Sequence, residues 1–150
     1  MKDLGGLYMS ISTKPKKVTF KHAESEWYNY YQTLKEIANL REAIMNPTKE
    51  IDENVGGGRS NATTSPTEKI VTRLSTNKQL KYLEEITTAI ENVYNALPND
   101  YKKLVQVRYW KKDKRLTWDG IAAELNVSRR QAIYWRDDII QATVEVLGWR

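Results

Sequence analysis

Four side chains close to residue 130 have the types and spacing that point most clearly to a chemical role in this sequence. The pattern predicts a helix that begins after Ser128 and directs these side chains outward. They are Arg129, Arg130, Ile133 and Tyr134. An arginine at the start of such a helix can donate two hydrogen bonds to a guanine, and an isoleucine or tyrosine can contact a thymine methyl group. These residue types at this spacing favour the reading of base edges in the major groove of double-stranded DNA.

The residues before this helix have the pattern of a partner helix followed by a tight turn. Thr117 is a helix cap, and Asn126 tolerates the left-handed backbone that a tight turn requires. Apolar side chains recur on the inner faces of both expected helices, with a small residue at their crossing: Ile121, Ala122, Leu125, Val127, Ala132 and Trp135. Together these features predict a helix-turn-helix. The alternative is a purely structural helical hairpin whose arginines are solvated.

Basic residues are concentrated beside this motif. Residues 98–150 hold 11 basic and 7 acidic residues, whereas residues 1–97 hold 13 and 12, so most of the net charge of +5 belongs to the C-terminal third. Basic side chains there would hold the DNA backbone and make binding depend steeply on salt. The predicted backbone contacts, including two cap hydroxyl groups, are Lys111, Lys112, Lys114, Arg115, Thr117 and Ser128. The alternative for the lysines is a solvated loop.

The composition argues against catalysis and against a bound metal. The chain has 150 residues, no cysteine and one histidine, so neither a metal site nor a Ser/His catalytic pair is expected. We therefore predict no catalytic residue, no metal ligand and no cofactor, and a binding protein rather than an enzyme. The lack of cysteine fits a reducing compartment. No run approaches the roughly 20 apolar residues of a membrane span, so we expect no membrane association.

The pattern along the chain predicts an all-α protein. We expect a polar arm over 1–19, a helix over 20–45, a Gly/Ser/Thr linker over 46–65, a long helix over 66–97 and a helix-turn-helix domain over 98–150. The roles of the arm and of the three glycines in the linker stay open.

Two local signals describe the helices before the helix-turn-helix. The long helix has a defined start, because Ser65 and Glu68 form a capping box with Pro66 at the first helical position. The helix over 20–45 carries a stripe at heptad spacing: Trp27, Tyr30, Leu34, Ile37, Arg41 and Ile44. This stripe can pack on another helix of its own chain, which we favour, or form the seam of a homodimer.

Several blocks of the chain resemble a known family. From Leu97-Pro98 onward, through residues 116–122 and Val127-Ser128-Arg129-Arg130, the layout is similar to the promoter-reading region 4 of sigma factors. The blocks at 52–61, 90–98, 109–110 and 116–122 resemble RinA-type phage transcriptional activators. The resemblance implies a sequence-specific activator of late phage operons for packaging and structural genes. It also implies action in the bacterial cytoplasm, with promoter DNA and host RNA polymerase as partners.

Two departures from the sigma pattern limit what carries over. Sigma-type readers often have an acidic residue after the first arginine of the second helix, where this chain has Arg130. No aromatic and basic helix resembles the region that engages the opened promoter strand, so this chain is not expected to be a complete sigma factor.

Two other functions stay open. One is a DNA-packaging component like a small terminase subunit, which would form a ring, and the other is an adaptor that binds polymerase but not duplex DNA.

Overall fold

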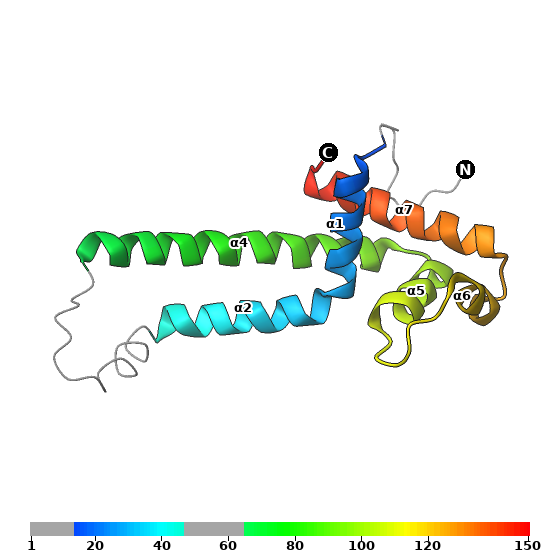
Figure 1. Ribbon diagram of the computed structural model, residues 1–150, viewed down its shortest axis with the longest axis horizontal. Coiled ribbons are helices and arrows are strands. Elements are labelled where there is room, and N and C mark those ends of the chain that lie inside the picture. The colour runs from blue at the N-terminus through cyan, green and yellow to red at the C-terminus, as the bar shows by residue number, and fades with distance from the viewer. Residues whose placement is uncertain (1–13, 47–64) are drawn as a thin grey trace. The chain divides into compact units, whose positions relative to one another are not determined.

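The computed structural model describes residues 14–46 and 65–150, and every regular element in these residues is a helix, as predicted (Figure 1). In chain order the elements are α1 (Lys17–Tyr28), α2 (Tyr30–Met45), α4 (Pro66–Ala96), α5 (Asn99–Val105), the π-helical turn η2 (Gln106–Trp110), α6 (Trp118–Leu125) and α7 (Arg129–Leu147). The linker glycines, Gly56 to Gly58, and most of the expected arm lie outside the described residues. None of the described helices is long and apolar enough to cross a bilayer.

The segment that was expected as one helix over 20–45 consists of two helices in the structure. α1 begins at Lys17, and Asn29 separates it from α2 with φ −92° and ψ 5°. The Asn29 N–H still donates to the carbonyl of Ser25 at 3.0 Å, so this backbone amide keeps a hydrogen-bond partner at the break between the helices. Asparagine is a weak helix former because its side chain competes for backbone hydrogen bonds. The apolar stripe therefore serves two cores, with Trp27 buried in one and Ile37 in the other.

The described residues form two compact units. The major unit comprises residues 14–30 and 88–150, and the hairpin unit comprises residues 31–46 and 65–87. Helix α4 is continuous and contributes to both, with Ser65 Oγ accepting a hydrogen bond from the Glu68 N–H at 3.1 Å, as the capping box predicts. Its 31 residues measure about 46 Å at ~1.5 Å per residue.

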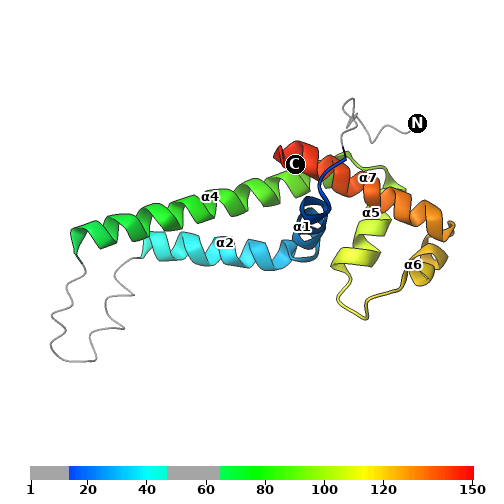
Figure 2. The same cartoon turned by 45° about the horizontal axis from the view of Figure 1, so that its top comes forward.

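In the hairpin unit, α2 runs alongside α4 in the opposite direction, as Figures 1 and 2 both show. Thr33 and Ile37 of α2 and Ile86 of α4 are buried. Arg41, which interrupts the apolar stripe, forms an ion pair with Glu84 of α4. The stripe of α2 therefore packs against its own chain, which is the arrangement that we favour from the sequence.

In the major unit, α1 packs across α7, far from it in sequence (Figures 1 and 2). Trp27 of α1 has no exposed surface, and its indole Nε1 donates to Thr143 Oγ1 of α7 at 2.9 Å. Trp110 of η2 stacks on Trp27 and donates from Nε1 to the Trp27 carbonyl at 3.1 Å. Fully buried aliphatic side chains of this core include Val93, Leu104, Ile121, Ile139 and Ile140. Helix α1 is thus an integral part of the unit that contains α6 and α7.

Candidate nucleic-acid interface

Helices α6 and α7 are joined by a three-residue turn whose hydrogen bonds follow from its residue types. Thr117 Oγ1 accepts from the Gly120 N–H at 3.2 Å, and Ser128 Oγ accepts from the Gln131 N–H at 3.0 Å. Both are N-cap bonds that satisfy free amides at a helix start. Asn126 is left-handed, with φ 56° and ψ 42°, and the next N–H donates back to the Ala122 carbonyl at 3.1 Å. The caps and the turn are those that the sequence predicts.

The apolar residues expected at the crossing of these helices lie on their inner faces to different extents. Ile121, Ala122 and Ala132 are buried, whereas Leu125, Val127 and Trp135 are half-buried. The ring of Trp135 stacks on Tyr101 of α5, with 5.1 Å between ring centres. Tyr101 in turn donates from its hydroxyl to Asp138 of α7 at 3.0 Å. Helix α5 therefore helps to orient α7.

The four side chains expected to read bases lie at the start of α7. Arg129, Arg130 and Tyr134 are exposed, and Ile133 is half-buried. Arg129 Nε is 3.7 Å from Asp119 Oδ1, and both side chains are more than half exposed. Such an exposed pair contributes little to stability, so Arg129 can leave it at low cost for a stronger partner.

Five of the six residues expected to contact a DNA backbone lie in the segment between η2 and α6, and the sixth, Ser128, caps α7. Lys111, Lys112, Lys114 and Arg115 are all exposed. Lys111 lies 3.4 Å from Glu124, and the Arg115 guanidinium lies 4.3 Å from the ring centre of Tyr28 of α1. The hydroxyl groups of Thr117 and Ser128 accept the cap bonds, which leaves each O–H free to donate. The segment is therefore a basic surface next to the start of α6.

A partly buried ion cluster, which the sequence did not indicate, ties α1 to η2 and α7. The carboxylate of Glu24 is 14% exposed and accepts from Arg108 at 3.0 and 3.2 Å, from the Tyr109 hydroxyl at 2.6 Å and from Arg136 at 3.0 Å. We call these four residues the Glu24 cluster. Both of its guanidinium groups also face Trp118, the first residue of α6, at 4.1 and 5.0 Å from a ring centre. The cluster therefore links α1, η2 and α7 to the start of α6.

The charge state of Glu24 follows from its neighbours. Burial alone would raise the pKa of its carboxyl group, but the hydrogen bond from Tyr109 and the charges of Arg136 and Arg108 outweigh burial and lower the pKa below its ordinary 4.5. Burial and the Glu24 charge raise the pKa of Tyr109 well above its usual range. The hydroxyl of Tyr109 therefore stays protonated and donates a hydrogen bond to Glu24. At neutral pH the cluster therefore holds one carboxylate and two guanidinium ions.

The described residues contain no cluster of side chains that could ligate a metal ion. Among them, no three histidine, aspartate or glutamate side chains converge as they would around a metal ion. The features that stand out are an exposed helix start with two arginines, a neighbouring basic segment and a rigid support beneath them.

In the residues that the structure describes, these features define a helical protein in which a tight turn joins α6 to α7, with a basic surface beside them. The chain belongs to the family described as "Protein of unknown function (DUF722)", whose model matches residues 27–145. It is similar to the protein named "Transcriptional activator rinA" of Staphylococcus phage phi11, with 28% identity over 130 residues, or 87% of this chain and 91% of that protein. The resemblance to RinA-type activators is thereby confirmed. No solved structure matches the chain.

Proposed function

We propose that this protein is a sequence-specific DNA-binding transcription activator of a bacteriophage, which acts on late genes for packaging and structural proteins. One observation carries the proposal: the capped start of α7 exposes Arg129, Arg130 and Tyr134, while Ala132 on the opposite face is buried. In a recognition helix, this side reads bases in the major groove. The similarity to a protein named as a transcriptional activator supports the regulatory role.

In this function the four residues at the start of α7, Arg129, Arg130, Ile133 and Tyr134, read bases. The exposed segment before α6 and the two cap hydroxyl groups hold phosphates, through Lys111, Lys112, Lys114, Arg115, Thr117 and Ser128. The partners are promoter DNA and host RNA polymerase inside the bacterial host cell. The homodimer expected through the N-terminal helices remains part of the proposal. The exposed Ile70, Val71 and Leu74 of α4 are further apolar surface that a second copy could cover.

The decisive experiment is selection of bound duplexes from a random pool by the purified protein. Enrichment of one defined site supports a sequence-specific activator. Binding without any enriched site, together with a stable ring of many subunits in light scattering, would support a packaging component instead. Binding of polymerase without any salt-dependent binding of duplex DNA would support an adaptor.

Replacing Arg129 by alanine should weaken binding to the selected site by about 1–3 kcal/mol, because an arginine at the start of a recognition helix can donate two bonds to one guanine. The preference at one base pair should relax, and affinity for random duplex should change less. Fluorescence anisotropy with the site and its single-base variants measures both effects. Arg73→Ala, an exposed arginine of α4, is the matched control and should bind like the unaltered protein. Retained base preference in Arg129→Ala would contradict this docking.

Replacing Lys112 by alanine should weaken binding to every duplex alike, because a phosphate contact carries no base information. The slope of log Kobs against log salt concentration should fall in magnitude by about one. A titration at several salt concentrations measures it, with the exposed Lys78 of α4 changed to alanine as the control. An unchanged slope in Lys112→Ala would remove this residue from the interface.

A further inference from the structure

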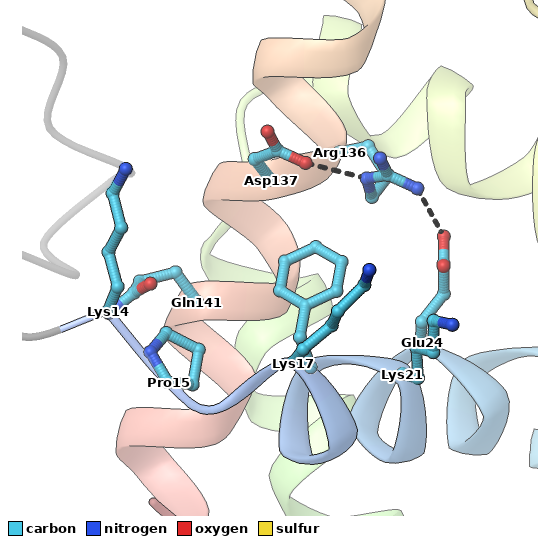
Figure 3. Close-up of a pocket in the computed structure, with 9 residues that line it drawn as sticks. Lys14, Pro15, Lys17, Lys21, Glu24, Arg136, Asp137 and Gln141 are labelled. Atoms are coloured by element: carbon cyan, nitrogen blue, oxygen red, sulfur yellow. Dashed lines mark hydrogen bonds and ion pairs between the residues drawn. The ribbon is translucent and has the colours of Figure 1, made fainter.

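A cleft of about 460 Å³ opens between the start of α1 and the middle of α7, within the major unit. Lys14, Lys17 and Lys21 line it from the α1 side, and Arg136, Asp137 and Gln141 line it from α7 (Figure 3). Lys14 and Lys17 belong to the expected arm, 1–19, whose role the sequence left open.

The charges around this cleft leave a positive excess. Arg136 bonds to both carboxylates that border the cleft, to Glu24 at 3.0 Å and to Asp137 at 2.7 Å, as the dashed lines in Figure 3 show. Within residues 14–46 and 65–150, no ion pair joins the three lysines to a carboxylate. Four cations therefore face two carboxylates, and both carboxylates are already engaged. Such a cleft attracts an anion.

The cleft adjoins the same side of α7 that carries the proposed base-reading residues. Arg130, Tyr134, Asp137 and Gln141 are spaced by four, three and four residues, so they form one stripe along the helix. The stripe covers about 16 Å at ~1.5 Å per residue. Arg130 and Tyr134, at one end of the stripe, are exposed and are proposed to read bases, whereas Asp137 and Gln141, at the other end, line the cleft. If the major groove of a duplex receives the start of α7, we expect the phosphate backbone that borders this groove to lie alongside the stripe.

We propose that the lysine-lined cleft binds backbone phosphate of the DNA duplex beside the base-reading face, so that Lys14, Lys17 and Lys21 extend the interface onto α1. The inference rests on the function proposed above and adds a second backbone contact, separate from the segment 111–115. A duplex is favoured over an acidic protein segment because the cleft is continuous with the stripe that carries Arg130 and Tyr134. Helix α1 then has two roles, since it supports α7 through Trp27 and binds DNA through its first two turns.

The test compares two triple variants of the full chain. In the first, Lys14, Lys17 and Lys21 are changed to glutamine. In the matched control, Lys69, Lys78 and Lys81 of α4, all exposed, are changed to glutamine, so both variants lose the same charge. For each phosphate that the cleft variant no longer neutralises, the salt slope should fall by about 0.9 and Kobs about eightfold at roughly 0.1 M salt. The reduction should be the same for selected and random duplexes, and the control should bind like the unaltered protein.

The remaining outcomes separate the two proposals. Equal slopes for the cleft variant and the unaltered protein would overturn the phosphate site while the proposed function stands. Failure of the unaltered protein to bind duplex would overturn the proposed function and this inference with it. A cleft variant that binds duplex normally but no longer binds purified RNA polymerase would assign the cleft to a protein partner, which also overturns the inference. Arginine at the same three positions should preserve the slope, because it preserves the charge.

Discussion

Replacing Trp27 by alanine is expected to lower the free energy of unfolding of the major unit by about 4 kcal/mol. The side chain is fully buried, and truncating a buried tryptophan removes its transfer energy and leaves a cavity. The variant also lacks the hydrogen bond to Thr143 and the stacking on Trp110. A domain of this size is stabilised by about 5–15 kcal/mol in total, so the variant should be marginal.

Urea unfolding followed by tryptophan fluorescence measures this change selectively. All five tryptophans of the chain, at positions 27, 110, 118, 135 and 149, lie in the major unit, so the signal reports on that unit alone. Trp27→Phe should cost less, since it keeps most of the apolar volume. Val18→Ala, at a position of α1 that is 78% exposed, is the control and should change stability by less than about 0.5 kcal/mol. An unfolding midpoint unaffected by Trp27→Ala would mean that α1 does not support α7.

Replacing Glu24 by glutamine is the second large prediction, with an expected destabilisation of about 3 kcal/mol at neutral pH. This value is at the low end of the range for removing one partner of a buried ion pair, because the carboxylate keeps some exposure. The variant retains the shape of the side chain but leaves Arg108 and Arg136 without their shared counter-charge. The two guanidinium groups that contact the ring of Trp118 then lose the carboxylate that orients them, so the start of α6 is positioned less precisely. The proposed DNA affinity should therefore fall together with stability.

The pH dependence of stability tests the same cluster independently. The pKa of Glu24 is lowered in the folded protein, so its contribution is present above the ordinary value of 4.5 and is lost as the pH falls through the folded value. The difference in unfolding free energy between the unaltered protein and Glu24→Gln should therefore shrink below about pH 4.5. Glu145→Gln, at an exposed position of α7, should show no such difference. A difference that stays constant from neutral pH to well below pH 4.5 would contradict an ionised Glu24 at the centre of the cluster.

Local features of this protein could be predicted from its sequence because neighbouring residues decide them. Thr117, Asn126 and Ser128 act on amides and carbonyls only a few residues away, and each does so in the structure. The start of α4 at Ser65 follows for the same reason. Helical periodicity was sufficient for the all-α class, and the exposure of Arg129 and Arg130 follows from the apolar positions on the opposite face of α7.

The contacts that support α6 and α7 were decided only by the tertiary structure. Glu24 bonds to residues 84, 85 and 112 positions away, and Trp27 bonds to a residue 116 positions away. No local pattern distinguishes a glutamate that will be partly buried between two arginines from one that faces solvent. The stripe at heptad spacing suggested one continuous helix, but the break at Asn29 gives Trp27 to one core and Ile37 to the other. Periodicity shows which side of a helix is apolar, whereas its partner depends on how the distant parts of the chain pack together.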